Sequence, residues 1–252
     1  MDIITIANQK GGVGKSTTAA ALGAGLKMLG NTVLFIDLDP QVNLTTALGA
    51  DVNDLTVYDV LKTKDINEAI QTIEDKDIIA GDRMLSNADI EFNLPGREYK
   101  LQKALKNLKK QYDYIIIDTP PALGMLTINA LTASHHVIIP AEADISSLQG
   151  VAQLKDTIDA VKEFCNPNLK ISGILLTRFS KTILSRDLAE TFSGVAETMG
   201  TRVFKNPIRE CIAIKEAKTQ QEDIFSYAPK SNAAIDYLEL TKDFLEGVKG
   251  NG

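Results

Sequence analysis

The chain has 252 residues, of which 44% are hydrophobic and 24% are charged, and its formal net charge is -6. This composition supplies a sizeable core and excludes a disordered chain, while the net negative charge argues against a surface evenly covered in cations. No apolar stretch reaches the ~18 to 20 residues that span a bilayer, and residues 1–8 lack the basic segment that begins a secretory signal. We therefore expect a soluble, cytoplasmic protein, either an enzyme or a switch.

Short β-branched runs alternate along the chain with longer helical patterns. Strands are expected at 3–7, 32–36, 114–117, 136–139 and 171–176, with shorter candidates at 77–80 and 203–204. Helices are expected at 16–29, 98–110, 147–163, 184–198 and 232–247. This alternation predicts a doubly wound α/β fold, with a mainly parallel sheet and helices on both faces. Residues 40–97, with a weak helix near 56–62, form a looser insertion, and without a linker residues 1–252 are expected to be one domain.

A candidate phosphate-binding loop follows the first expected strand directly. Its sequence is QKGGVGKST, and the Gly-Lys-Ser at its end stands where a helix is expected to begin. The glycines would let backbone N–H groups surround phosphate oxygens, and the positive end of the helix would face the same anion. We expect Lys15 to hold the β- and γ-phosphates of ATP and Ser16 to bind Mg²⁺, which predicts a P-loop nucleotide hydrolase. The loop residues expected to bind nucleotide are Gly11, Gly12, Val13, Gly14, Lys15, Ser16 and Thr17.

Carboxylates follow two of the expected strands. Asp37 and Asp39 end the second strand, and Asp118 ends the strand at 114–117. Because the carboxyl ends of parallel strands meet at one edge of a sheet, these side chains are expected beside the phosphate loop. Magnesium needs oxygen ligands, and hydrolysis needs a group that positions water, so Asp39 and Asp118 are the candidates for these tasks.

The loop departs from the ordinary phosphate-loop pattern in two ways. Gln9 stands where the first glycine would be, and a second lysine, Lys10, precedes Lys15 by five positions. This KGGVGKST form resembles the loop of the ParA/MinD family of ATPases. The resemblance implies that Lys10 reaches across a dimer interface to the partner's nucleotide, so that two subunits enclose two ATP molecules. Such a second cation would act like an arginine finger supplied in trans.

The acidic segments resemble the ParA-type partition ATPases more than MinD. They are DLDPQ, which ends at Gln41, and DTPP, which ends at Pro121. The resemblance implies that Asp39 orients or activates water, that Asp118 acts on Mg²⁺ through a water, and that Asp37 supports both. The expected catalytic residues are therefore Lys10, Lys15 and Asp39, and the expected metal-binding residues are Ser16, Asp39 and Asp118.

The resemblance extends over nearly the whole chain, with two departures. Residues 123–131 and blocks at 208–209, 216–217 and 227–231 are similar to family motifs. The block at 208–209 implies an adenine pocket at Ile208 and Arg209. Relatives usually carry glycine where this chain has Val42, and often carry asparagine where it has Cys211.

One third of the chain is a candidate DNA-binding region. Residues 178–230 carry nine basic and seven acidic residues, whereas residues 1–177 and 231–252 are both net negative. The chain begins at its first strand, so the resemblance implies the short family type, which lacks an N-terminal helix-turn-helix and binds DNA non-specifically as an ATP dimer. Phosphate contact needs clustered cations. The candidates are Arg178, Lys181, Arg186, Arg202, Lys205, Lys215, Lys218 and Lys230.

The expected function is a weak ATPase that dimerises on ATP, binds the nucleoid and partitions plasmid or chromosomal DNA. A ParB-like centromere-binding protein would stimulate its hydrolysis. A membrane-bound MinD-like switch would need a basic amphipathic C-terminal helix, but the tail is acidic, so no membrane partner is expected. A metabolic P-loop enzyme remains an alternative. An iron–sulfur relative would need cluster-ligating cysteines, whereas Cys165 and Cys211 are expected to be buried, inert thiols.

Overall fold

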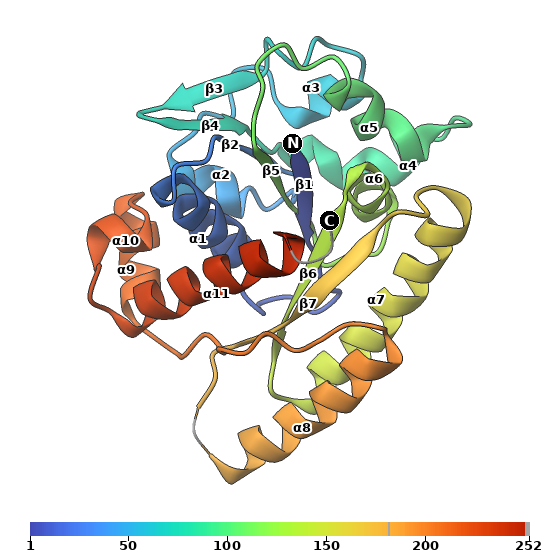
Figure 1. Cartoon of the computed structure of the whole chain (residues 1–252). Coiled ribbons are helices and arrows are strands. Elements are labelled where there is room, and N and C mark those ends of the chain that lie inside the picture. The colour runs from blue at the N-terminus through green and yellow to red at the C-terminus, as the bar shows by residue number, and fades with distance from the viewer. Residues whose placement is uncertain (181, 250–252) are drawn as a thin grey trace.

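A seven-stranded sheet forms the centre of the computed structural model, which describes residues 1–180 and 182–249 (Figure 1). Its strand order is β3-β4-β2-β5-β1-β6-β7, and every neighbouring pair is parallel except the antiparallel pair β3 and β4. The strands are β1 (Asp2–Ile6), β2 (Val33–Asp37), β3 (Ile70–Ile73), β4 (Lys76–Ile79), β5 (Tyr114–Asp118), β6 (His136–Glu142) and β7 (Lys170–Thr177).

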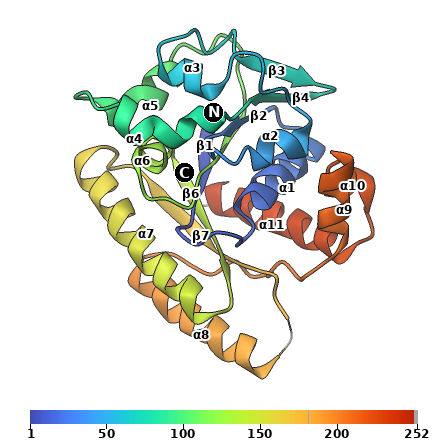
Figure 2. The same ribbon diagram turned by 180° about the vertical axis from the view of Figure 1, so that it is seen from behind.

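Helices cover both faces of this sheet, as Figure 2 shows from behind. The α-helices are α1 (Lys15–Met28), α2 (Asn43–Leu48), α3 (Val57–Leu61), α4 (Ala88–Glu91), α5 (Lys100–Leu105), α6 (Met125–Ala133), α7 (Ile145–Phe164), α8 (Ile183–Thr198), α9 (Ala213–Gln220), α10 (Ile224–Tyr227) and α11 (Asn232–Lys249). Two 3-10 helices are η1 (Arg83–Asn87) and η2 (Arg97–Tyr99). The expected doubly wound α/β fold is confirmed.

Successive strand residues feed two different cores, because strand side chains alternate between the faces of a sheet. On one face, Ile4 and Ile116 pack with α1, α9, α10 and α11. On the other face, Ile3 and Ile115 pack with α3, α5 and α6, while β6 and β7 pack with α7 and α8. Strands buried on both faces explain why the sequence shows nearly continuous apolar runs.

The insertion is more ordered than the sequence suggested. Residues 77–80 were expected as a possible strand and are confirmed as β4, but the β3 strand beside it was missed because its Gln and Thr weaken the apolar pattern. Residues 203–204 form only an isolated bridge to Ile174 rather than a strand. The helix expected at 98–110 ends at Leu105, since Lys103, Lys106 and Lys110 would repel one another along a longer helix.

No helix among the described residues has both the length and the apolar character needed to cross a membrane. The C-terminal helix α11 instead packs along α1, and its Tyr237, Leu240 and Phe244 are buried in the core. The apolar face of α11 is therefore used within the fold.

Candidate functional site

Strand register brings the phosphate loop and the carboxylates to one edge of the sheet. Strand β5 lies between β1 and β2, so that Asp118 stands opposite Ile6 on one side and opposite Asp37 on the other. The phosphate loop begins just after Ile6. Three segments that are far apart in the sequence therefore meet at the carboxyl ends of adjacent strands, where α/β folds bind ligands.

Glycines shape the loop, and β7 anchors it. Gly12 and Gly14 have φ angles of 83° and 86°, in the left-handed region that a side chain disfavours. The hydroxyl of Thr177 donates to the carbonyl of buried Val13 over 2.9 Å. Gly14 precedes α1, and no side chain caps this helix. The first N–H groups of α1 are thus left to bind an anion.

The Lys15 side chain lies inside the loop rather than in solvent. Its ammonium donates to the carbonyl of Lys10 over 3.2 Å, and the residue is only 6% exposed. Burial lowers the pKa of Lys15, while the carboxylates of Asp118 and Asp39 act in the opposite direction. The loop therefore holds a cation at its centre, near Asp118 at the end of β5 and Asp39 just after β2.

Both oxygens of the Asp37 carboxylate accept hydrogen bonds from the protein. The donors are the backbone N–H of Asp39 at 3.0 Å and the N–H and hydroxyl of Thr45 at 2.8 and 2.7 Å. Burial raises the pKa of Asp37 to about 6, against the effect of these hydrogen bonds. Asp37 therefore braces the start of α2 rather than offering an oxygen to a ligand.

Asp118 has the opposite character. It is completely buried, and neither carboxylate oxygen accepts a hydrogen bond of ordinary geometry from the described part of the chain. Burial raises its pKa well above the usual value and Asp37 adds to this, whereas the Ser16 hydroxyl and Lys15 oppose it. Buried oxygens without partners are costly unless a ligand satisfies them.

The donor set around Asp118 fits Mg²⁺. Ser16, Asp39 and Asp118 supply the hard oxygen atoms that this cation prefers. One oxygen of Asp39 accepts from the N–H of Gln41 at 3.0 Å, and burial raises the pKa of its carboxyl. No group of three or more His, Cys, Asp or Glu residues in the described chain could hold a metal by itself. Phosphate oxygens and water would have to complete the coordination shell.

Lys10 is held by residues of its own chain. Its ammonium lies 2.5 Å from Asp144, 3.5 Å from Glu142 and 3.3 Å from the hydroxyl of Ser147. Glu142 also pairs with Arg178 at 2.8 Å. No local pattern in the sequence indicates this cluster, because its acidic members are separated from Lys10 by more than a hundred residues.

A cavity of about 410 Å³ extends from the start of α1 to the segment before α9. It is lined by Gly14, Thr17, Thr177, Arg178, Ile208, Arg209, Glu210, Cys211, Ile212, Ile214, Lys215, Lys218 and Tyr237. The predicted adenine residues Ile208 and Arg209 therefore lie next to the phosphate loop. The Arg209 guanidinium pairs with Asp236 at 2.6 Å, which fixes its direction.

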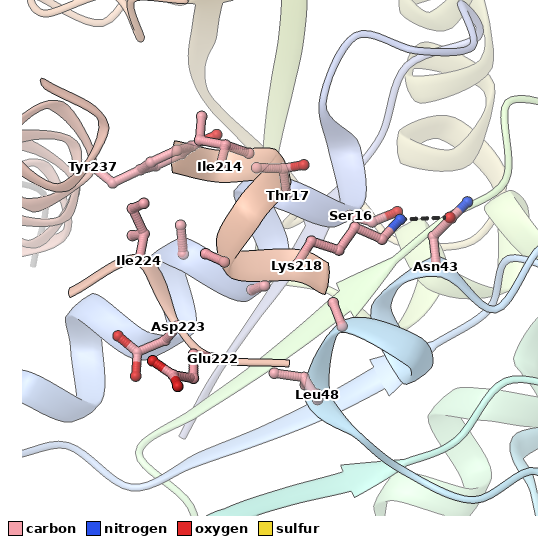
Figure 3. Close-up of a pocket in the computed structure, with 14 residues that line it drawn as sticks. Ser16, Thr17, Asn43, Leu48, Ile214, Lys218, Glu222, Asp223, Ile224 and Tyr237 are labelled. Carbon is pink, nitrogen blue, oxygen red and sulfur yellow. Dashed lines mark hydrogen bonds between the residues drawn. The ribbon is translucent and has the colours of Figure 1, made fainter. Parts of the chain in front are cut away.

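A second pocket adjoins this cavity and shares Thr17, Ile214, Lys218 and Tyr237 with it (Figure 3). Its apolar wall includes Leu48 and Ile224, and the ammonium of Lys218 crosses it to donate to Asn43 over 2.9 Å. This contact joins α9 to α2, the helix that follows Asp39. A hydrogen bond therefore connects α9 to the helix that follows the loop around Asp39.

The expected DNA-binding residues do not form one patch. Arg178, Lys215 and Lys218 line the cavities beside the phosphate loop, whereas Arg202 pairs with Asp243 and lines a hollow at the amino end of β6 and β7. Arg186, Lys205 and Lys230 are exposed, and Lys181 lies outside the described residues. The prediction that Cys165 and Cys211 are buried is wrong, because both free thiols are only partly covered.

Val42 adopts an unusual backbone conformation. Its φ is 50°, in the left-handed region that β-branched residues strongly disfavour. Its N–H donates to the carbonyl of Asp39 over 2.9 Å, and its carbonyl accepts from Thr46 at the start of α2. Val42 is therefore a site of backbone strain beside Asp39.

Comparisons with known proteins give consistent results. A family model described as an AAA domain matches residues 1–171. The sporulation initiation inhibitor protein Soj of Bacillus subtilis is 42% identical, over 99% of this chain and 99% of Soj. The chromosome partitioning protein ParA of Myxococcus xanthus is 37% identical, over 97% and 88%. The structure of cobyrinic acid a,c-diamide synthase from Mycobacterium smegmatis, with a bound ATP analogue and magnesium, aligns with TM-score 0.85 and 35% identity, over 100% and 97%.

Proposed function

The chain belongs to the ParA/Soj family of partition ATPases, and we propose that it works as an ATP-driven DNA-binding switch. In this proposal, residues 1–252 act as one ATPase domain that binds ATP with Mg²⁺ and dimerises around two nucleotides. The dimer binds DNA non-specifically on the nucleoid. Hydrolysis is slow until a ParB-like centromere-binding protein stimulates it, and the DNA is then released, which partitions a plasmid or chromosome.

The observation that carries this proposal is the pairing of the glycine loop with Asp118. The loop presents the uncapped end of α1 and the buried Lys15, which suits the phosphates of a nucleotide. The buried oxygens of Asp118 accept no hydrogen bond of ordinary geometry in the described chain, and the nearby hydroxyl of Ser16 lowers the pKa of this carboxyl. Bound Mg²⁺ would neutralise charge that develops on the phosphates.

The two remaining charged groups would take different tasks. Asp39 keeps one carboxylate oxygen outside the hydrogen bond to Gln41, and we propose that it orients the attacking water. Lys10 would leave its own carboxylates and reach the nucleotide of the second subunit, where it would stabilise the transferring phosphoryl group. Ile208 and Arg209 would border the adenine.

A second candidate function is a metabolic reaction that uses the same loop. The cobyrinic acid a,c-diamide synthase structure is named after an amide-forming enzyme, and it is 35% identical to this chain. A small-molecule substrate could occupy the cavity of about 410 Å³ beside the loop. DNA binding distinguishes the two candidates, because a small-molecule enzyme has no reason to bind DNA in response to ATP.

The test is retention of duplex DNA at about 200 mM salt with ATP, with ADP and without nucleotide, since salt at this level suppresses binding that depends on only a few phosphate contacts. We expect strong retention in the presence of ATP and little retention with ADP or without nucleotide. Equal retention in all three conditions would contradict the switch, and no retention in any of them would favour the metabolic alternative.

A further inference from the structure

The strongest local charge of the chain lies outside the region considered for DNA binding. Residues 97–110 contain six basic residues and a single acidic residue, Glu98. They form η2, the short helix α5 and the turn that follows it. A charge count over residues 1–177 conceals this run, because acidic residues elsewhere in that long segment outweigh it.

In the folded chain, Lys64, which follows α3, lies with cations of this run around one groove. The groove has a volume of about 410 Å³, and its charged lining residues are Lys64, Arg97, Lys100 and Lys103. None of the described residues that line it is acidic. Its floor is apolar and comes from α3 and α5, with Val60, Leu61 and Ala104. A surface hollow with cations on its rim and no carboxylate attracts anions.

Most of these cations have no acidic partner. In the described part of the chain, Lys64, Arg97, Lys103 and Lys106 form no ion pair with a carboxylate. Lys100 donates to the carbonyl of Leu61 over 2.8 Å. By contrast, three neighbouring lysines are paired, with the pairs being Lys62 with Glu91, Lys109 with Asp65 and Lys110 with Asp77. The unpaired charges gather around the groove and at the end of α5.

The surface around the groove offers little to a membrane. Leu101 and Leu105 on the inner side of α5 are buried in the core, so the helix has no apolar face left to insert into lipid. Leu94 is the one large exposed apolar side chain among the described residues that line the groove. Cations that surround a groove with few exposed apolar side chains suit the phosphates of a nucleic acid.

We propose that Lys64, Arg97, Lys100, Lys103 and Lys106 form a second DNA-binding surface, which holds the backbone phosphates of duplex DNA without sequence preference. The inference rests on the proposed DNA binding but places part of it on the other face of the sheet. Helices α3 and α5 pack on the face opposite α9, α10 and α11 (Figures 1 and 2). We expect contact through this surface without a bound nucleotide, because the groove shares no lining residue with the two pockets beside the phosphate loop.

A quadruple variant tests the proposal, with Lys64→Gln, Arg97→Gln, Lys103→Gln and Lys106→Gln. Its matched control removes the same charge from four ion-paired lysines, with Lys62→Gln next to the groove and Lys27→Gln, Lys155→Gln and Lys242→Gln away from it. At about 50 mM salt without nucleotide, we expect the variant to bind random duplex DNA at least roughly tenfold more weakly than the control. The slope of log affinity against log salt should fall by about 0.9 for each phosphate that the variant no longer neutralises.

Thermal unfolding and nucleotide binding of the variant should match the control, because the substituted side chains lie on the surface. Equal DNA affinity and equal salt slope for the two proteins would overturn the proposal. The proposal would also be overturned if anionic phospholipid vesicles captured the control but not the variant while both proteins bound DNA equally well. That result would assign the surface to a membrane. A failure of ATP to raise DNA retention in either protein would count against the proposed switch alone, because the nucleotide-free comparison does not depend on it.

Discussion

The ammonium of Lys10 and the carboxylate of Asp144 form an ion pair at 2.5 Å within a single chain. The other oxygen of Asp144 accepts from the N–H of Ser147 at 2.8 Å and caps α7. Burial would raise the pKa of Asp144, but the hydrogen bonds from Lys10, Ser146 and Ser147 outweigh it and hold the pKa at about 2. For Lys10 to reach a nucleotide of another subunit, it must therefore exchange this carboxylate for a phosphate.

Removing the charge of Asp144 should make that exchange easier. Asp144→Asn keeps an oxygen that can cap α7 but weakens the hold on Lys10. We expect a several-fold tighter ATP-dependent dimer, measured by sedimentation equilibrium with ATP. The control is Asp156→Asn, which removes an exposed carboxylate from the same helix. An Asp144→Asn protein that dimerises no better than this control would show that the pair does not restrain Lys10.

Lys15 should be required for nucleotide binding. Lys15→Ala removes the cation buried in the loop, so the affinity for a fluorescent ATP analogue should fall by about 100-fold or more, as charged hydrogen bonds to phosphate are strong. Lys27→Ala, at the far end of the same helix, serves as the control and should bind normally. Near-normal ATP affinity of the Lys15→Ala protein would contradict the role assigned to the loop.

Asp39 and Asp37 should separate into catalytic and structural residues. Asp39→Ala should bind ATP but hydrolyse it at least ~100-fold more slowly, which is the range for loss of a general base, and should remain bound to DNA. Asp37→Ala leaves the N–H groups of Asp39 and Thr45 without partners, so its unfolding free energy should fall by about 2 kcal/mol or more. ATP turnover and chemical denaturation measure the two effects, and a normal turnover rate for Asp39→Ala would refute its role.

The strain at Val42 predicts an unusual response to glycine. Val42→Gly should leave the unfolding free energy unchanged or raise it by up to about 1 kcal/mol, because relief of the left-handed conformation offsets the entropy of the new glycine. Val52→Gly, at an exposed position without a positive φ, should instead lower it by about 0.5 to 1 kcal/mol. Equal decreases in both proteins would mean that Val42 stores no strain.

The sequence alone predicted those features that depend on the order of residues and elements along the chain. The alternation of strands and helices predicted the parallel sheet, and strand-end positions predicted that Asp37, Asp39 and Asp118 would gather at the phosphate loop. Both inferences follow from periodicity and from the rule that ligands bind at the carboxyl ends of strands. Both inferences were possible because the β-branched runs were long enough to identify the strands and their ends.

The features that escaped prediction depend on contacts between distant segments. Nothing near Lys10 reveals that Asp144 holds it, and nothing near Asp118 reveals that its oxygens have no partner in the described chain. The candidate DNA-binding residues were chosen only because they lie within residues 178–230. In the fold, Arg202 and Lys218 line separate pockets. Side-chain clusters of this kind are set by tertiary packing, which outweighs local pattern.

The mass of the ATP complex tests the central idea most directly, because two subunits must each supply Lys10 to the other's nucleotide. Light scattering on Asp39→Ala protein with ATP should give the mass of a dimer, and with ADP the mass of a monomer. Adding Lys10→Ala should return the ATP complex to a monomer that still binds nucleotide. A complex that stays monomeric with ATP, or a dimer that survives Lys10→Ala unchanged, would contradict the account.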